Sequence, residues 1–228
     1  MSDAVAVAEP QIGVITGLAA EGAIARSFSR HVVSGGGRAD HTEAWIKHLI
    51  RGGVTGLVSF GIAGGLSAEA PCGTIVIASD VWSRDGVIQA HHPWVEHLST
   101  ILAGSKVGRI VGQDKIAATT EDKQALAMAS HGLAIDMESH VVARLAAMYG
   151  LPFAVIRAIS DGPTRSLPHA AQVGMSPSGS VDFGAVFRSI ALKPTQLPGL
   201  ITVAREARKA TQALVVAADR LRVHGLMA

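Results

Sequence analysis

The sequence predicts an α/β fold, a single three-layer domain in which helices cover both faces of a central mixed, mostly parallel sheet. Short apolar runs alternate with helix-like segments along the chain, which is the order expected of such a sheet. Val54 to Phe60 is almost wholly apolar, as is typical of a strand that is buried on both faces. The 25 glycines fit many tight turns between strands and helices.

The length and composition favour a single globular domain and argue against several kinds of site and partner. A chain of 228 residues is long enough for one α/β domain with a substantial core, and 48% hydrophobic against 17% charged residues indicates a well-buried protein. The formal net charge is +2, and no run of Lys and Arg is interleaved with aromatic residues, which argues against a nucleic-acid partner. A single cysteine, Cys72, excludes an internal disulfide framework and a cysteine-rich metal site.

The chain ends and the hydropathy favour a cytoplasmic protein. The first residues carry an acid at position 3, no basic region and an early proline, unlike a signal peptide. No window supplies the roughly twenty apolar residues that span a bilayer. We expect residues 1–10 to be a flexible leader and residues 11–228 to form one domain.

Local patterns define the elements of the first half. Apolar runs predict strands at 11–16, 31–34, 54–60 and 73–81. Helices are predicted from Glu21 to Arg30, where alanines favour helix, and from His41 to Ile50, which has an apolar stripe. Gly61 to Gly65 is predicted to be a turn that a ligand can approach closely. It lacks the spacing of a dinucleotide fingerprint and of a phosphate loop.

The second half supplies a crossover and a long loop. A strand at 106–112 and a helix at 120–130 precede Gly132 to Asp161, which reads as strand, helix and strand in a right-handed parallel crossover. Gly162 to Asp182 is rich in Pro, Gly and Ser and too long for an ordinary connection, which predicts a lid or a ligand-covering loop. A final helix ends near His224. The histidines at 91, 92 and 97 lack zinc-site spacing, so no metal is expected.

Three acidic residues follow predicted strands. Glu21 lies just past the first strand, and Glu138 and Asp161 follow the two strands of the crossover. Ligands of open parallel sheets bind beyond the carboxyl ends of the strands. Two acids whose surroundings push their pKa values apart can break a glycosidic bond. The alternative is that Glu21 and Glu138 only occupy helix N-termini, where the macrodipole favours them, and that Asp161 caps a turn.

The segments IGVITGLAAE, SFGIAGGL, AIDMES and VIRAISD, in this order, resemble the nucleoside phosphorylase and methylthioadenosine/S-adenosylhomocysteine nucleosidase superfamily. Further segments, including SGGGRA, DMESHVVARLAA and KPTQLPGL, resemble its hopanoid-associated branch, whose members are implicated in removing adenine from adenosylhopane. The resemblance implies a nucleoside phosphorylase-like fold. It also implies cleavage of adenosylhopane to ribosylhopane and adenine, with another 5'-substituted adenosine such as methylthioadenosine as the alternative. A non-catalytic nucleoside-binding protein is the alternative from a different class.

The resemblance also implies roles for individual residues. Asp161 matches the acid that protonates purine N7, Glu138 the carboxylate that binds the ribose hydroxyls, and Glu21 the carboxylate that activates water. We therefore expect a water-poor setting that keeps Asp161 protonated, and an ionised Glu138. Met137 matches the residue beneath the sugar. Further substrate contacts are expected from Phe60, Ile62, Ala63, Gly64, Gly65 and Ser160.

Departures from the family pattern favour water as the nucleophile, with no cofactor. Ser59 and Ile62 stand where phosphate-using relatives carry an arginine and a serine, and the turn at 17–20 has no arginine. A phosphate dianion would lose its strongest bonds there and would be repelled by Glu21. Arg38, after three glycines, keeps inorganic phosphate open as the alternative nucleophile.

The partners follow from the same resemblance. The expected substrate is a small nucleoside-lipid molecule, and the 162–182 loop, with Leu167, Val173, Met175 and Val181, is a candidate apolar channel for the lipid. The C-terminal helix is a candidate for peripheral contact with the inner face of the membrane. Relatives assemble as dimers or trimers, so we expect a homo-oligomer, with a dimer as the default.

Overall fold

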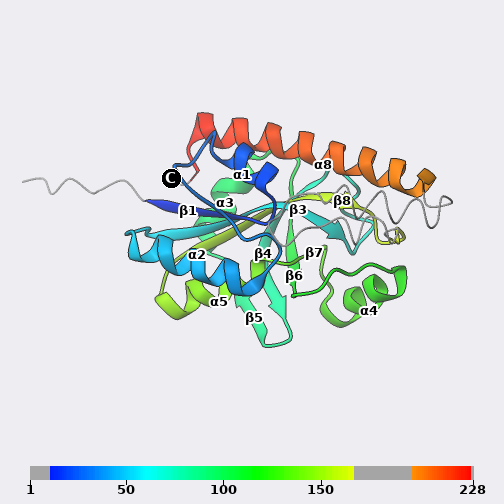
Figure 1. Cartoon of the computed structure of the whole chain (residues 1–228), viewed down its shortest axis with the longest axis horizontal. Helices are drawn as coiled ribbons and strands as arrows, with labels where there is room; N and C mark the ends of the chain where they lie inside the picture. Colours follow the sequence, from blue (N-terminus) through cyan, green and yellow to red (C-terminus); the bar gives the residue numbers. More distant parts are fainter. Residues whose placement is uncertain (1–10, 167–196, 227–228) are drawn as a thin grey trace, which may run out of the picture.

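A mixed sheet forms the centre of the protein (Figure 1). The computed structural model describes residues 11–166 and 197–226. Within these ranges eight strands share one sheet: β1 (Ile12–Thr16), β2 (His31–Ser34), β3 (Gly56–Gly65), β4 (Ile75–Ser83), β5 (Gly86–Gln89), β6 (Lys106–Gly112), β7 (Ala134–Asp136) and β8 (Phe153–Asp161). The helices are α1 (Ala19–Ala25), α2 (Ala39–Arg51), α3 (His92–Ile101), α4 (Thr120–Ser130), α5 (Ser139–Tyr149) and α8 (Leu197–His224).

Five of the strands close into a ring. β3 pairs with β7, β7 with β6, β6 with β4, β4 with β8, and β8 with β3. β1 and β2 extend the sheet from β3, and β5 extends it from β4. The parallel pairs outnumber the antiparallel ones, as the sequence predicts. The carboxyl ends of β3 and β8 lie side by side, with Gly64 opposite Asp161, and β7 begins beside the same end, with Ala134 opposite Gly65.

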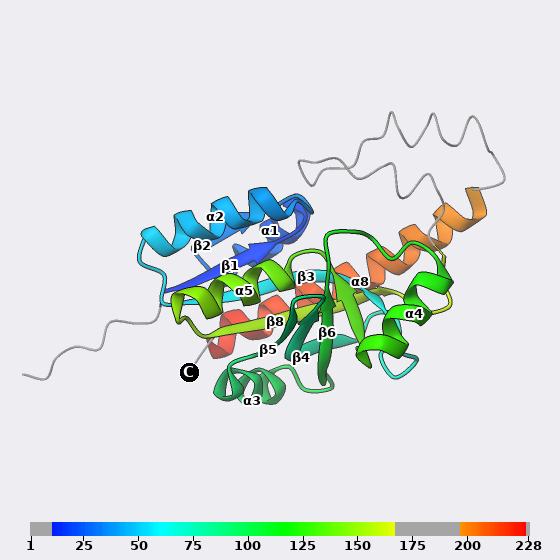
Figure 2. The same ribbon diagram turned by 90° about the horizontal axis from the view of Figure 1, so that it is seen from below.

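Helices cover both faces of the sheet. α1 and α8 contact each other on one side, and α2 and α5 contact each other on the other side (Figures 1 and 2). The apolar stripe predicted on the last helix is buried, at Ala210, Leu214, Ala217 and Leu221. The predicted three-layer α/β fold is therefore confirmed, and no helix of the described residues is long and apolar enough to cross a membrane.

The predicted parallel crossover is wrong. β8 runs parallel to β3, whereas β7 runs antiparallel to β3, with Ala134 opposite Gly65 and Ile135 opposite Gly64. β7 therefore turns back along the end of β3. Because of this reversal, the chain runs from the end of β3 back toward Gly61 as it approaches Glu138. A parallel strand would run away from Gly61.

The predicted turn at Gly61 to Gly65 is also wrong, because these residues continue β3. Gly61 pairs with Arg157 and Ile62 with Ala158 in the parallel register with β8. The glycines are needed for the close approach of neighbouring side chains, and the chain does not reverse here. β5, which forms a hairpin with β4, is an element that the sequence did not predict. The predicted lid lies outside the described residues from position 167 onward.

Candidate active site

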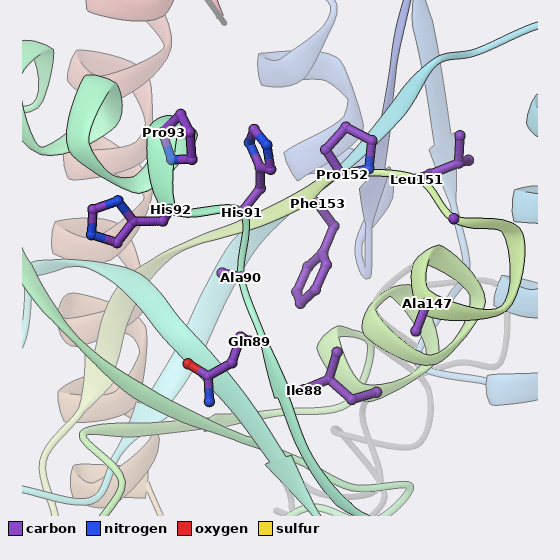
Figure 3. Close-up of a pocket in the computed structure, with 11 residues that line it drawn as sticks. Ile88, Gln89, Ala90, His91, His92, Pro93, Ala147, Leu151, Pro152 and Phe153 are labelled. Atoms are coloured by element: carbon purple, nitrogen blue, oxygen red, sulfur yellow. The ribbon is translucent and has the colours of Figure 1, made fainter.

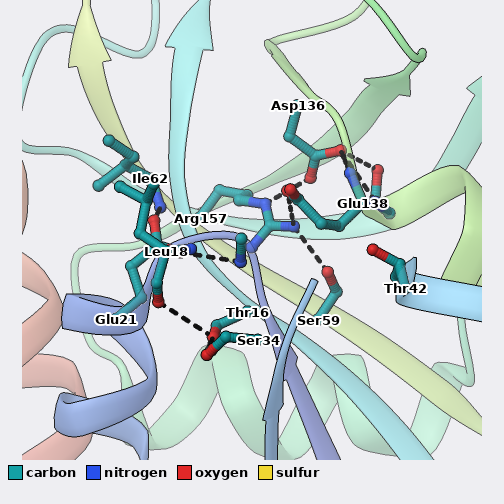
Figure 4. A network of polar contacts seen from close by, with 12 residues as sticks. Thr16, Leu18, Glu21, Ser34, Thr42, Ser59, Ile62, Asp136, Glu138 and Arg157 are labelled. Atoms are coloured by element: carbon teal, nitrogen blue, oxygen red, sulfur yellow. Dashed lines mark hydrogen bonds and ion pairs between the residues drawn. The ribbon is translucent and has the colours of Figure 1, made fainter. Parts of the chain in front are cut away.

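Glu21 is held against the end of β3 by backbone N–H groups. Its Oε2 atom accepts hydrogen bonds from the N–H groups of Gly17 at 3.0 Å and Leu18 at 2.8 Å. Its Oε1 atom accepts one from the N–H group of Ile62 at 2.8 Å (Figure 4). A Cβ atom at Gly61 would lie 2.8 Å from the carboxyl group, so glycine makes room for it. Glu21 is thus buried and fixed between β1 and β3.

Glu138 meets Glu21 at Gly17. It follows β7 as the residue that precedes α5, and it is buried. A Cβ atom at Gly17 would lie 2.6 Å from Oε1 of Glu138, and the N–H group of the same glycine binds Glu21. The first turn of the chain therefore brings together two acids that are 117 positions apart, the difference between 138 and 21.

Arg157 lies between these acids and was not predicted. Its side chain, 0% exposed in the middle of β8, forms an ion pair with Asp136 through Nε and donates a hydrogen bond to Oγ of Ser59 at 2.6 Å (Figure 4). Its Nη2 atom is 3.7 Å from Oε2 of Glu138. Asp136 also accepts hydrogen bonds from Ser139, at 2.9 Å from N–H and 2.6 Å from the hydroxyl. An arginine in an otherwise apolar strand, VIRAIS, is the signal that could have identified it.

Asp161 ends β8 and contacts a second basic residue, Lys123. The hydroxyl of Ser160 donates to Oδ1 of Asp161 at 2.6 Å, and the Lys123 ammonium forms an ion pair with Oδ2. A Cβ atom at Gly64 would lie 3.7 Å from both carboxyl oxygens. Gly64 lies three residues beyond Gly61, a rise of roughly 10 Å along β3, so Glu21 and Asp161 contact this strand at different points.

The other predicted contact residues surround this region at different depths. Met137 is partly buried, with its Cε atom 3.6 Å from the position of a Cβ at Gly37. The carbonyl oxygen of Ala63, 3.1 Å from Oγ of Ser160, is an alternative acceptor for the single hydroxyl proton, and Ile62 and Gly65 belong to the same end of β3. Phe60 has no exposed surface, and its ring packs edge-on against Phe28 with 5.2 Å between centroids.

The two glutamates beside Arg157 have raised pKa values. Burial raises the pKa of Glu138 to about 8; Arg157 opposes the shift, while Asp136 and Glu21 add to it. Burial also raises the pKa of Glu21, opposed by Arg157 and by the backbone hydrogen bonds. Burial thus opposes the ionised form that was predicted for Glu138, and the Arg157 guanidinium only partly compensates.

The proton predicted on Asp161 has a different setting from the one expected. The side chain is buried, at 6% exposed, which agrees with a water-poor site. Its partner, however, is the Lys123 ammonium, which itself is 1% exposed. No pattern in the sequence predicts a lysine at this place.

Arg38 does not take part in the cluster of acids. Its Nε and Nη2 atoms donate to the two carboxylate oxygens of Asp40 at 3.1 and 2.6 Å, and 45% of its side chain is exposed. Its guanidinium is thus committed to a neighbour at the start of α2. No group of three or more His, Cys, Asp or Glu side chains within 11–166 and 197–226 is arranged to hold a metal ion.

A cavity of about 610 Å³ lies elsewhere, where β8 begins (Figure 3). It is bounded by Ile88 to Pro93, Ala147 and Gly150 to Phe153. Its titratable lining residues are His91 and His92, and no carboxyl group lines it. Because β8 starts at this cavity and ends at Asp161, the cavity and the acids occupy opposite ends of the strand. The carboxyl cluster is the site with the means for acid and base chemistry.

Comparisons with known proteins identify the family of the chain. The model of the Phosphorylase superfamily matches residues 15–191. 5'-Methylthioadenosine/S-adenosylhomocysteine nucleosidases of Staphylococcus aureus strains are 26% identical over 127 residues, which cover 46% of this chain. The match spans little more than half, 56%, of the length of these curated relatives.

Solved structures show the same fold. A nucleosidase of this kind from Helicobacter pylori, in complex with butyl-thio-DADMe-Immucillin-A, has a TM-score of 0.65 at 16% identity over 92% of this chain and 98% of that one. The S-adenosylhomocysteine nucleosidase of Streptococcus pyogenes has a TM-score of 0.66 at 16% identity, with coverages of 95% and 99%. The futalosine hydrolase of H. pylori has a TM-score of 0.64 at 16% identity, with coverages of 92% and 97%.

Replacing Arg157 with Met should destabilise the fold by about 3–5 kcal/mol, because Asp136 would remain buried without its cation. Arg144→Met is the matched control. Arg144 also donates to a carboxylate, Glu43 at 2.6 Å, but its side chain is 41% exposed. Its loss should cost about 0–1 kcal/mol. Urea denaturation of both variants measures the difference, and equal losses would contradict the role given to Arg157.

Replacing Glu138 with Gln should flatten the pH dependence of stability. The pKa of Glu138 is raised from 4.5 to about 8 by folding, so the folded protein keeps a proton that the unfolded chain releases. The resulting stabilisation is complete below pH 4.5 and is lost as the pH rises through 8. The free energy of unfolding of the wild type, relative to Glu138→Gln, should therefore fall between about pH 5 and pH 8.

Glu43→Gln is the control for this titration. The Lys47 and Arg144 hydrogen bonds lower the pKa of Glu43 to about 2, so this group releases its proton below the tested range in both states. The Glu43→Gln variant should keep the pH dependence of the wild type. A constant difference between wild type and Glu138→Gln from pH 5 to pH 8, about the range in which the raised pKa acts, would refute the assignment.

Proposed function

Because the chain belongs to the Phosphorylase superfamily, we propose that it is a purine nucleosidase that hydrolyses the N-glycosidic bond of a 5'-substituted adenosine. The observation that supports the proposal is the meeting of Glu21 and Glu138 at Gly17, with Asp161 further along β3 beside Gly64. The names of the S. aureus relatives, methylthioadenosine/S-adenosylhomocysteine nucleosidases, support the same reaction class.

In this proposal the three acids act on different parts of the nucleoside. Departure of adenine leaves positive charge on the sugar, and protonation of the base lowers the barrier, typically by 10²- to 10⁴-fold. Asp161 delivers that proton to the base. Glu21 takes a proton from the attacking water on the opposite side of the ring, as in an inverting glycosidase. The raised pKa of Glu21 makes its ionised form a stronger base than an exposed glutamate.

Glu138 binds the ribose hydroxyls. Its raised pKa favours the protonated form before the reaction. Positive charge developing on the sugar favours the ionised form. The hydrogen bonds from the hydroxyls to Glu138 therefore become charge-assisted and strengthen as the glycosidic bond breaks. An interaction that is stronger in the transition state than in the ground state accelerates the reaction.

The contacts of Glu21 support water, without a cofactor, as the nucleophile. A cluster of backbone N–H groups can bind an anion. Here the N–H groups of Gly17, Leu18 and Ile62 already bind the Glu21 carboxyl group. A phosphate dianion would have to displace it and would then lie beside acids. Arg38, the residue that favoured inorganic phosphate as the alternative nucleophile, is exposed and forms an ion pair with Asp40.

Phosphorolysis of the same substrate, to a phosphorylated ribose, is the second candidate. One observation favours it: Nη1 of Arg157 is buried and makes no hydrogen bond among the described residues. A buried guanidinium nitrogen of this kind is a strong donor to a phosphate oxygen. The two candidates differ in whether the sugar product carries phosphate.

The purified protein should release adenine from methylthioadenosine in phosphate-free buffer, with an unphosphorylated sugar as the second product. Asp161→Asn should lower this rate by at least about 10²-fold, because the departing base loses its proton donor. Chromatography of the base and mass spectrometry of the sugar measure both. A strict requirement for added phosphate would establish phosphorolysis, and a fully active Asp161→Asn would disprove the role of Asp161.

We propose further that the 5' substituent is a hopane, so that adenosylhopane yields ribosylhopane and adenine. The segments that resemble the hopanoid-associated branch support this substrate. The outer face of α8 supports contact with a lipid surface, because it exposes apolar side chains: Ile201, Val215, Val216 and Val223. In this proposal the protein is a cytoplasmic homodimer that touches the inner face of the membrane.

In mixed detergent micelles, adenosylhopane should be cleaved with a kcat/KM at least about tenfold above that of methylthioadenosine, a factor that needs only about 1.4 kcal/mol of extra transition-state binding. The measurement is adenine release from each substrate at matched concentrations. Equal turnover would remove the reason for the narrower substrate. Binding of either nucleoside without any adenine release would instead indicate a non-catalytic nucleoside-binding protein.

A further inference from the structure

Lys123 is buried on a helix that is otherwise largely exposed. Of the residues of α4, Lys123 and Ser130 are buried, and the Lys123 side chain is 1% exposed. Lysine is almost never fully buried unless it is paired, and burying an ion pair often gives no net stability. The place of this ammonium therefore calls for a reason other than the stability of α4.

The ammonium contacts the end of β8 at two points. It forms an ion pair with Oδ2 of Asp161 and donates a hydrogen bond to the carbonyl oxygen of Gly162 at 2.9 Å. The other carboxyl oxygen of Asp161 accepts from the hydroxyl of Ser160 at 2.6 Å. Lys123 is thus directed at the carboxyl group that acts on the base in the proposed function.

Other contacts already hold α4 in place. At its start, the N–H group of Thr120 donates to Oγ of Ser166 at 3.2 Å, and the two hydroxyl groups are 2.9 Å apart. Further along, Leu126 and Ala127 pack against a separate apolar cluster that comprises Leu66, Val111, Ala117 and Ile135. The helix therefore has its own anchors at both ends, independent of the lysine.

We propose that Lys123 is a positioning residue that supplies, through Asp161, the proton taken up by the departing base. This inference rests on the proposed nucleosidase function. It accounts for a carboxyl group that must donate a proton although it is paired with a cation. The resting site then stores the proton on the ammonium, and Asp161 passes it on.

The proposed step balances in atoms and electrons. One proton moves from the Lys123 ammonium to Asp161, and Asp161 gives one proton to the base, whose nitrogen keeps the electron pair of the broken glycosidic bond. The hydroxyl of the attacking water bonds to the sugar carbon, and the remaining water proton goes to Glu21. Adenine leaves neutral, Lys123 is left as an amine and Glu21 as an acid. Proton exchange with solvent after product release restores both.

The test compares two leaving groups in the full-length protein. Methylthioadenosine needs a proton on its base, whereas the 4-nitrophenyl riboside with the same 5'-methylthio group releases a stable anion. Lys123→Met keeps the length of the side chain without its charge. It should lower kcat for adenine release by about 10²-fold or more, with KM little changed, and lower nitrophenol release by less than about threefold. Asp161→Asn should show the same pattern.

Leu126→Ala is the control for a structural role, because it loosens the packing of α4 without touching Asp161. Its losses should be equal for the two leaving groups. A small primary ammonium ion added to Lys123→Ala should restore part of the adenine release, and circular dichroism should show that each variant is folded.

Full adenine release by Lys123→Met would overturn the inference. Equal losses of Lys123→Met on both substrates, or no rescue of Lys123→Ala by the added ammonium, would do so as well. A wild-type protein that cleaves neither substrate would overturn the proposed function and this inference with it. A wild type that cleaves both, with Lys123→Met unimpaired, would overturn the inference alone.

Discussion

The structure of the site depends on one buried guanidinium. Arg157 reaches from the middle of β8 to Asp136 at the end of β7 and to Ser59 in β3, so it joins three strands of the ring. Asp136 in turn binds the first residues of α5, which fixes the backbone that carries Glu138. A charged group in the interior is tolerated only with partners. Here the partners are residues of the site itself. The need to pair the buried guanidinium therefore also positions the acids around it.

Two glycines, Gly17 directly after β1 and Gly61 in β3, make space for the acids. A side chain at Gly17 would collide with Glu138, and one at Gly61 would collide with Glu21. Both acids can therefore lie close to the backbone, and for Glu21 the N–H groups of Gly17, Leu18 and Ile62 replace the water that a buried carboxylate loses. The same absence of side chains resembles a turn when only the letters are read. This is why the sequence predicted a loop where β3 continues.

The sequence predicted well the features that depend on a repeated pattern, such as the strands and layers. It predicted poorly the features that depend on a single residue. Alternating apolar segments give the strands and the layers, and the three acids follow from their places after strands. The direction of β7 could not be predicted, because a strand of three residues carries no signal of its orientation. Arg157 and Lys123 were missed because an isolated basic residue is usually solvated, and only the fold reveals that each one faces a carboxyl group.

Under the proposed function, the charged groups of the site are arranged along the glycosidic bond, with one set beside the sugar and another beside the base. The sugar end holds Glu21 and Glu138 with a guanidinium that is already paired with Asp136, and the base end holds Asp161 with an ammonium. Negative charge accumulates beside the carbon that becomes positive, and a proton lies beside the nitrogen that becomes negative. The side chains are positioned before the reaction, so only protons have to move while the bond breaks. Burial of Glu21 and Glu138 raises their pKa values, because a water-poor interior disfavours the charged carboxylates. Positive charge that develops on the sugar offsets this effect of burial.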